Sequence, residues 1–245
     1  MADDLIFYTN PMSRGQIVRW MLEEVGAPYQ TQILGYDDSM KGADYLAINP
    51  MGKVPAIVHR GKVVTECAAI CAYLADAFPD AGLAPPLEAR ADYYRWLFFA
   101  AGPLETAVTN THAGWVPSAE QQRMVGYGSF EKALDALETA VADKAFVAEG
   151  RFSAADVYVG SQLDWGLQFG TIPTRRPSAS AAPRSRASAR RSAAIVLGAR
   201  IASGVWASVL TMTGSATRRR RQPVAMRSSW RWAFSPSEPA QMIVA

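Results

Sequence analysis

The sequence predicts an α/β domain, then an all-helical domain, and finally a C-terminal tail of different composition. Short apolar runs alternate with helical patterns up to about residue 80, and long helical stripes without strands follow. Arg, Ser and Ala dominate from Thr174 onward, where no amphipathic period survives. The expected divisions are an α/β domain at 1–80, a linker at 81–86, a helical domain at 87–173 and a tail at 174–245.

The first domain is predicted to begin with a strand, a helix and a second strand. The apolar run 5–8 leads through the turn 9–11 into a helical pattern, for which Gly26 is the stop signal. Residues 29–34 have the pattern of a second strand, and 35–45 that of a loop or short helix. The order of elements so far is strand, helix, strand, helix.

A hairpin and a helix are predicted to complete this domain. Residues 55–59 and 62–65 flank Arg60 and Gly61, which favours a tight turn between antiparallel strands. A helical pattern then continues to the Phe78-Pro79 pair. Alternating strands and helices that end in a hairpin and a helix indicate an α/β sandwich of thioredoxin type.

Three helices are expected in the second domain. The second follows Ser118–Gln121, which has the pattern of a capping box, and the third begins at Ser153–Asp156 with another. Two apolar stripes at helical spacing define the first two helices. They are Tyr94, Leu97, Phe98, Ala101, Leu104 and Val108, followed by Phe130, Leu134, Leu137 and Val141.

Charge divides the chain at the same place as composition. The chain has 245 residues and a formal net charge of +3. From Thr174 onward there are thirteen Arg, no Lys and one acidic residue, Glu238, which gives +12 for the tail and leaves −9 for residues 1–173. The start of the chain has no basic region typical of a secretory signal, so we expect a cytoplasmic protein.

The two cysteines, Cys67 and Cys71, do not predict a disulfide or a metal site. They lie four residues apart on one predicted helix, where side chains run alongside each other and seldom bridge. No other residues have metal-ligand spacing. We therefore expect no metal and no disulfide.

The Val54-Pro55 pair is the first candidate for a ligand-binding position. A proline at the head of a strand is confined to places where its missing N–H is useful or harmless, and the start of a ligand-facing strand is one such place. An ordinary edge-strand proline is the alternative. Asn49-Pro50, Lys53 and Thr65–Cys67 lie nearby in the sequence and favour the ligand-facing interpretation.

Glu66 and Cys67 lie at the predicted first turn of a helix. Backbone N–H groups and the positive end of the helix dipole attract a carboxylate there, while Glu66 can pair with an ammonium group. Both charges are present on the amino-acid head of a γ-glutamyl group. The alternative is that Thr65 caps the helix and Glu66 complements its dipole without any ligand.

Ser13 opens the first helix next to the end of the first strand. A hydroxyl at this position can donate to a bound thiolate, which lowers the pKa of that thiol by favouring its charged form. Ser13 can equally be a helix cap and nothing more. Arg14 and Arg19 are expected to be solvated helix charges.

Four segments, in this order and spacing, resemble the soluble glutathione transferases, especially bacterial members with a serine in the active turn. The resemblance covers residues 1 to about 173. It implies a thioredoxin-like glutathione-binding domain and an all-helical domain that supplies most of the pocket for an electrophile. The segments are 8–15, 49–55, 65–67 and 152–156.

The resemblance also implies roles for individual residues. Ser13 would activate the glutathione sulfur, and Met12 and Trp115 would border the second substrate. Glutathione would be a co-substrate, no other cofactor would be needed, and the protein would be a homodimer. By this resemblance, Lys53 would contact the tripeptide backbone or the glycyl carboxylate, and Val54 would pair with the cysteinyl backbone. Pro55 would follow a cis peptide bond. Glu66 and Cys67 would hold the γ-glutamyl end.

Two features depart from the family pattern. Position 67 usually carries serine, and the thiol of Cys67 is a poorer hydrogen-bond donor. A cysteine at a helix N-terminus can also have a lowered pKa and form a mixed disulfide with glutathione. The second departure is the tail at 174–245, which stands where family members continue with further helices.

The composition of the tail suggests four interpretations. Arg clusters suit nucleic acid, but few aromatic residues are interleaved with them, so we expect no nucleic-acid partner beyond weak binding. The apolar stretch 193–214 resembles a membrane span, but Arg200 inside it would cost about 2.5–3.5 kcal/mol near mid-bilayer, so we expect no membrane association. The favoured interpretation is a shifted reading frame, with a genuine disordered extension as the alternative.

The function predicted from the sequence is conjugation of the glutathione thiolate to a small hydrophobic electrophile. One alternative is a glutathione-dependent thiol reductase or dehalogenase on the same fold. Another, from a different class, is a non-catalytic binding protein of the same architecture.

Overall fold

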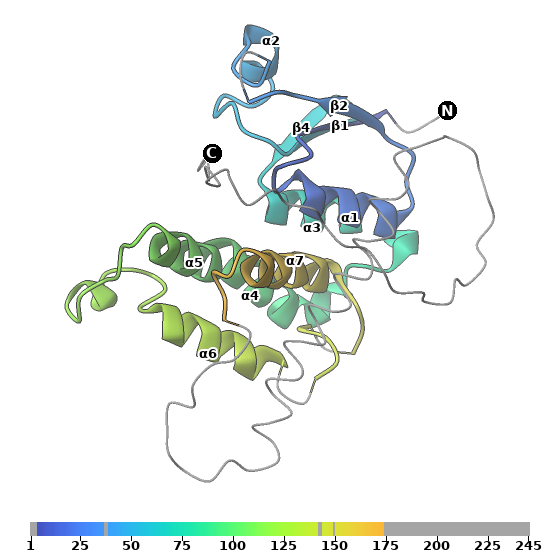
Figure 1. Ribbon diagram of the computed structural model, residues 1–245. Coiled ribbons are helices and arrows are strands. Elements are labelled where there is room, and N and C mark those ends of the chain that lie inside the picture. The colour runs from blue at the N-terminus through green and yellow to red at the C-terminus, as the bar shows by residue number, and fades with distance from the viewer. Residues whose placement is uncertain (1–3, 37–38, 142–143, 149, 174–245) are drawn as a thin grey trace, which may run out of the picture.

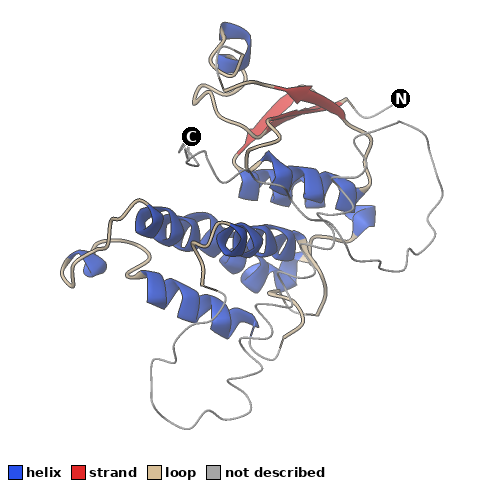
Figure 2. Cartoon of the chain, viewed as in Figure 1, coloured by secondary structure: helices blue, strands red, loops and turns tan. Residues whose placement is uncertain are grey.

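The computed structural model describes residues 4–36, 39–141, 144–148 and 150–173, so the tail predicted at 174–245 lies outside the described residues. A sheet with its helices lies above a layer made of helices alone (Figures 1 and 2). The first part of the chain contains β1 (Leu5–Thr9), α1 (Gly15–Val25), β2 (Gln30–Ile33), α2 (Ala43–Leu46), β3 (Ala56–His59), β4 (Lys62–Thr65) and α3 (Cys67–Ala77). The second part contains α4 (Arg90–Phe99), the π-helical segment η3 (Ala100–Leu104), α5 (Glu105–His112), α6 (Phe130–Val141) and α7 (Ala154–Gln168).

The four strands form one mixed sheet in the order β2-β1-β3-β4. β1 pairs with β2 in parallel, whereas the pairs β1–β3 and β3–β4 are antiparallel. α1 and α3 lie side by side between this sheet and the helical domain (Figure 1). The thioredoxin-like α/β arrangement predicted from the sequence is confirmed.

Local signals in the sequence explain most of the turns. Gly26 takes a φ of 65° at the end of α1, where its backbone N–H bonds to the carbonyl of Leu22. Arg60 and Gly61 both have positive φ, 53° and 74°, which suits the tight turn of the β3–β4 hairpin. These turns fix the register of the strands that lead to the site.

One hydrophobic core runs through both parts of the chain. It extends from Leu5 in the first strand to Ile172 beyond the last described helix. α7 packs against α1, α3 and α4, so this helix joins the two domains. A smaller cluster around Met40, Tyr45 and Ala56 lies with α2 on the other side of the sheet (Figure 1).

Short 3-10 helices and ion pairs hold the connection between the domains. The 3-10 segments are η1 (Pro79–Ala81) and η2 (Leu87–Ala89). The Arg90 guanidinium donates to both carboxylate oxygens of Asp76, at 2.7 and 3.3 Å, and its Nε donates to the carbonyl of Pro85. A bidentate pair of this kind restrains direction as well as distance, so α4 is fixed relative to the end of α3.

The apolar stripe predicted for the first helix of the second domain is partly wrong. Phe98 is 69% exposed and Tyr94 is 40% exposed, whereas Tyr93 and Trp96 are buried. The side of α4 that faces the core therefore includes Tyr93 and Trp96 in place of Tyr94 and Phe98. The hydrophobic residues alone did not show which side of α4 faces the core, because aromatic residues occupy both sides of this helix.

The first of the two predicted capping boxes forms, but it does not open α6. The backbone N–H of Ser118 donates to Gln121 at 2.8 Å, and the N–H of Gln121 donates to the Ser118 hydroxyl at 3.3 Å. This box lies at the turn that leads into the 3-10 helix η4 (Gln121–Arg123). α6 instead begins after Ser129, whose hydroxyl accepts from the N–H of Lys132.

The capping box predicted for the last helix is confirmed. The Asp156 carboxylate accepts from the backbone N–H of Ser153 at 2.9 Å and from its hydroxyl at 2.8 Å. It also accepts from the N–H of Val147 at 2.7 Å, so it ties the preceding loop to the start of α7. Burial raises the pKa of this carboxyl, while the hydrogen bonds from Val147 and Ser153 act in the opposite direction.

Replacing Asp156 with alanine should lower the free energy of unfolding by about 2 kcal/mol. The change removes acceptors for two backbone N–H groups and a hydroxyl at the start of the helix that joins the domains. Urea denaturation of the full chain measures the effect. Asp80→Ala, at an exposed position, is the control and should change stability by less than about 0.5 kcal/mol. Equal effects of the two changes would contradict this role of Asp156.

Candidate functional site

The strand register gathers the predicted site residues at one edge of the sheet. Ala56, the first residue of β3, pairs with Tyr8 on one side and with Thr65 on the other. The residues just beyond these three therefore meet at the same edge. They are the turn after Thr9, the Val54-Pro55 bond and the start of α3 at Glu66.

The segment before β3 is held by hydrogen bonds to its backbone. The Lys53 carbonyl accepts from the Tyr45 hydroxyl at 2.6 Å and from the side-chain amide of Asn49 at 2.8 Å. The Val54-Pro55 peptide bond is cis, as the resemblance implies. Tyr45 comes from α2, so this short helix fixes the approach to the site.

Lys41 belongs to this edge, although sequence reasoning did not single it out. Its ammonium donates to the Gly52 carbonyl at 2.7 Å. Gly52 has a φ of 57°, and a Cβ there would lie 3.0 Å from Lys41 Cδ and Nζ, so only glycine fits without displacing that side chain. Lys41 belongs to no recognisable motif. Its partner is the backbone carbonyl of Gly52, whose position depends on the fold of the loop.

Glu66 adopts an unusual backbone conformation at the start of α3. Its φ is 65°, in a region that non-glycine residues rarely adopt, at a cost of about 1–3 kcal/mol. Its carbonyl nevertheless accepts the first hydrogen bond of the helix, from the N–H of Ile70 at 2.8 Å. Such conformations cluster at ligand-binding positions. Here the exposed Glu66 side chain lies at the N-terminus of α3, where a helix leaves its first N–H groups without partners inside the helix.

Cys67 differs from the reactive thiol that the sequence suggested. Its side chain is buried, and its Sγ donates to the carbonyl of Arg14 over 3.7 Å. Burial raises the pKa of the thiol to about 12, and the negative charges of Glu105 and Glu66 act in the same direction. The expectation of a lowered pKa is therefore wrong, because desolvation outweighs the helix N-terminus.

Ser13 lies in the turn between β1 and α1 and is 7% exposed. Its hydroxyl donates to the carbonyl of Asn10 at 2.6 Å and accepts from the N–H of Gly15 at 3.0 Å. The turn is tight, because a Cβ at position 15 would collide with the hydroxyl of Thr9. The single O–H of Ser13 is thus directed at the backbone of its own turn.

Arg14 is not the solvated charge that the sequence suggested. Its guanidinium forms an ion pair with Glu105 at 3.0 Å and lies 5.7 Å from the ring centroid of Trp165. Glu105 opens α5 and Trp165 belongs to α7, so both partners come from the helical domain. The residue after Ser13 therefore connects the two domains.

Glu105 is the centre of a polar network between the domains. Besides Arg14, its carboxylate accepts from the amide of Gln162 at 3.0 Å and from the hydroxyl of Tyr158 at 3.3 Å. Gln162 also donates to the Tyr158 hydroxyl at 3.2 Å. Sequence reasoning missed these residues because they lie more than fifty positions apart along the chain.

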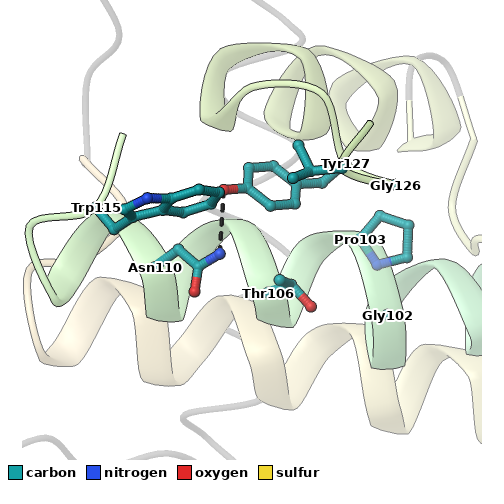
Figure 3. A pocket seen from close by; sticks show the side chains of 8 residues that line it. Gly102, Pro103, Thr106, Asn110, Trp115, Gly126 and Tyr127 are labelled. Atoms are coloured by element: carbon teal, nitrogen blue, oxygen red, sulfur yellow. Dashed lines mark hydrogen bonds between the residues drawn. The ribbon is translucent and has the colours of Figure 1, made fainter. Parts of the chain in front are cut away.

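The structure does not bring Met12 and Trp115 into one pocket. Met12 is exposed on the turn of the first domain, where its carbonyl accepts from the Tyr36 hydroxyl at 3.0 Å. Trp115 follows α5 and lines a hollow of about 410 Å³ in the helical domain (Figure 3). Met12 is not among the lining residues of this hollow.

Comparison with known proteins places the first domain in a family. A protein-family model described as "Glutathione S-transferase, N-terminal domain" matches residues 12–77, which include the site edge from the active turn to α3. The N-terminal domain belongs to the glutathione S-transferase family. The family resemblance inferred from the motifs is confirmed.

The match to one curated glutathione S-transferase is longer than the first domain of this chain. Glutathione S-transferase GstA of Escherichia coli O157:H7 is 33% identical over 132 residues, which are 51% of this chain and 62% of GstA. Protein LigF of Sphingobium sp. is 63% identical over 35 residues, 14% of each chain. This chain therefore covers less than two thirds of either relative.

A solved structure supports the same architecture. The beta class glutathione S-transferase of Sphingomonas chungbukensis is 26% identical and superposes with a TM-score of 0.60 over 84% of this chain and 98% of its own. Within the described part of our chain, no helix is long and apolar enough to cross a membrane. The same residues contain no group of three or more His, Cys, Asp or Glu side chains placed to hold a metal ion.

In the folded protein, Cys67 should resist alkylation. A pKa of about 12 instead of 9.0 lowers the thiolate fraction near pH 8 about a thousandfold. Iodoacetamide labelling followed by mass spectrometry should therefore modify Cys67 slowly in buffer and rapidly in urea. Because the pKa is raised on folding, this thiol's contribution to stability should be lost as the pH rises from 9 toward 12. Rapid labelling in buffer would show that the thiol is accessible and ionised.

A double-mutant cycle of Arg14→Ala and Glu105→Ala should give a coupling energy of about 1 kcal/mol. The pair is partly shielded from water, with side-chain exposures of 33% and 28%, and joins two domains. The matched control is the cycle for Arg95 and Asp92, a longer ion pair of 3.8 Å within one helix, in which the Arg95 side chain is 67% exposed. That control should couple by less than about 0.5 kcal/mol. Similar coupling energies in the two cycles would contradict the view that the Arg14–Glu105 pair holds the domains together more strongly than an ordinary pair within one helix.

Proposed function

We propose that this chain binds glutathione along the edge formed by Ser13, Pro55 and Glu66 and conjugates its thiolate to a small hydrophobic electrophile. The observation that carries the proposal is the glutathione S-transferase N-terminal domain at residues 12–77, whose sheet register collects these three residues at one edge. The likeness of the helical part to GstA extends the proposal beyond binding alone.

The charges at this edge suit the two ends of glutathione. The Glu66 carboxylate pairs with the γ-glutamyl ammonium, and the first N–H groups of α3 take the neighbouring carboxylate. At the other end, the ammonium groups of Lys53 and Lys41 suit the glycyl carboxylate, with Lys41 already directed at the loop backbone. The main chain at Val54 is left to pair with the cysteinyl residue of the tripeptide.

Ser13 supplies the hydrogen bond to sulfur in this proposal. Its hydroxyl must turn away from the Asn10 carbonyl, at 2.6 Å, before it can donate to a thiolate. The donor lowers the pKa of the bound thiol by favouring the charged form. The sulfur lone pair then forms a bond to the electrophilic carbon, and the electrons that it displaces leave with the departing group or remain on the acceptor.

Glutathione binding without turnover is the second candidate function. It is favoured by one observation, the commitment of the only Ser13 proton to the carbonyl of Asn10 within a tight turn. Glutathione-dependent reduction or dehalogenation uses the same binding edge and differs in the second substrate. Action as a cytoplasmic homodimer, with no cofactor besides glutathione as co-substrate, stays a prediction.

Replacing Ser13 with alanine should lower kcat/KM for conjugation about a hundredfold. Glutathione affinity should change less than about threefold, because the binding charges remain in place. The pKa of the bound thiol, followed by ultraviolet absorption of the thiolate, should rise in the variant. The assays should use several small hydrophobic electrophiles of different reactivity.

Ser118→Ala is a matched control for this experiment, because Ser118 also accepts from a backbone N–H but lies in the helical domain. It should leave turnover unchanged. Unaltered turnover and thiol pKa in the Ser13 variant would reject the role of Ser13. Tight glutathione binding by a wild-type protein that turns over no electrophile would favour the binding function.

A further inference from the structure

The turn that carries Ser13 is organised around Asn10, which directly follows β1. The Asn10 carbonyl accepts two hydrogen bonds from Ser13, one from the hydroxyl at 2.6 Å and one from the backbone N–H at 3.1 Å. The side-chain oxygen of Asn10 accepts from the backbone N–H of Met12 at 2.9 Å. Its side-chain amide donates to the carbonyl of Leu34 at 2.8 Å. Asn10 therefore holds the turn through its backbone and through both ends of its side chain.

Within the turn, the side chain of Asn10 limits how the backbone can lie. Its bond from the Met12 N–H closes an Asx turn, in which a short side-chain oxygen takes the place of a backbone carbonyl. Pro11 lies inside this turn and has a restricted φ. The direction of the Asn10 carbonyl, on which Ser13 rests, is therefore set by the residues of the turn itself.

The turn is also tied to the segment that follows β2. The N–H of Leu34 donates to the carbonyl of Thr9 at 2.9 Å, and the Asn10 amide returns a bond to the carbonyl of Leu34. The Tyr36 hydroxyl adds a third bond, to the carbonyl of Met12 at 3.0 Å. The turn is thus held by a neighbouring segment as well as by its own hydrogen bonds.

This arrangement fixes the oxygen of Ser13 while its proton can change acceptor. The backbone N–H of Gly15 donates to that oxygen at 3.0 Å, opposite the bond to the Asn10 carbonyl. If the hydroxyl turns toward a thiolate, the Asn10 carbonyl keeps the N–H of Ser13 as a donor. The exchange leaves no acceptor in the turn without a partner, so its free-energy cost is small.

We propose that Asn10 is a positioning residue for Ser13, which keeps the serine oxygen where it can donate to the glutathione sulfur. This inference rests on the proposed function, in which Ser13 stabilises the thiolate. Asn10 does not contact the sulfur and acts through Ser13 alone. Without the Asn10 side chain the turn can reorient, so the hydroxyl is directed at the sulfur for less of the time and stabilises the thiolate less.

The test compares two changes of Asn10 in the full-length protein. Asn10→Ala removes both side-chain bonds, whereas Asn10→Ser keeps an acceptor for the Met12 N–H and loses the amide donor to Leu34. Asn10→Ala should raise the pKa of bound glutathione by about one unit, followed by ultraviolet absorption of the thiolate, and should lower kcat about tenfold below that pKa. The KM for glutathione should change less than about threefold. Asn10→Ser should give about half of the pKa shift.

The double variant Asn10→Ala/Ser13→Ala separates positioning from a general loss of structure. Because Asn10 acts through Ser13, adding Asn10→Ala to Ser13→Ala should change kcat by less than about twofold and leave the thiol pKa where it is. Asn110→Ala is the matched control, since it also removes a donating side-chain amide, here from the hydroxyl of Tyr127 in the helical domain. It should leave kcat and the thiol pKa at their wild-type values. Circular dichroism establishes that each variant is folded.

The proposal is overturned if folded Asn10→Ala keeps the wild-type thiol pKa, or if its effect adds in full to that of Ser13→Ala. If Asn10→Ala does not fold, Asn10→Ser decides by the same criteria. A thiol pKa that rises in Ser13→Ala but in neither Asn10 variant rejects the positioning role alone. An unchanged pKa in Ser13→Ala, or a wild-type protein that does not bind glutathione, rejects the proposed function together with this inference.

Discussion

The contact between Arg14 and Glu105 determines how the turn between β1 and α1 is held. Arg14 follows Ser13 directly, and its carbonyl accepts from Cys67 at the start of α3. Its guanidinium extends to a carboxylate that the helical domain supplies. Hydrogen bonds from Tyr158 and Gln162 keep that carboxylate in position. The geometry of the turn therefore depends on the packing of α5 and α7, although neither helix belongs to the glutathione S-transferase N-terminal domain.

The binding edge itself relies on main-chain geometry more than on reactive side chains. Tyr45 and Asn49 hold the Lys53 carbonyl, and Glu66 keeps a φ of 65° at the start of α3. Cys67 contributes packing, because burial raises the pKa of its thiol to about 12. A site of this kind tolerates changes in the side chain at position 67 as long as the backbone of the first turn keeps its direction.

Local signals allowed the first domain to be predicted, since its turns and register depend on neighbouring residues such as Arg60 and Gly61. The same reasoning singled out Pro55 and Glu66 as ligand-binding candidates, and the strand register brings them to one edge of the sheet. It failed for Arg14, whose partner Glu105 lies ninety-one positions away and depends on how two domains pack. It also failed for the phase of α4, because aromatic residues such as Phe98 occur on both faces. Contacts between distant residues, and the choice of which side of a helix faces the core, are not marked by any pattern among neighbouring residues.

The absence of a side chain at Gly102 has a consequence for variation among related proteins. Gly102 is one of the residues that line the hollow beside Trp115, and a Cβ there would meet no atom within 4 Å. Each larger side chain at this position, from alanine to leucine, would therefore make the hollow shallower. Related chains can thus differ in the depth of this surface while sharing the rest of the architecture.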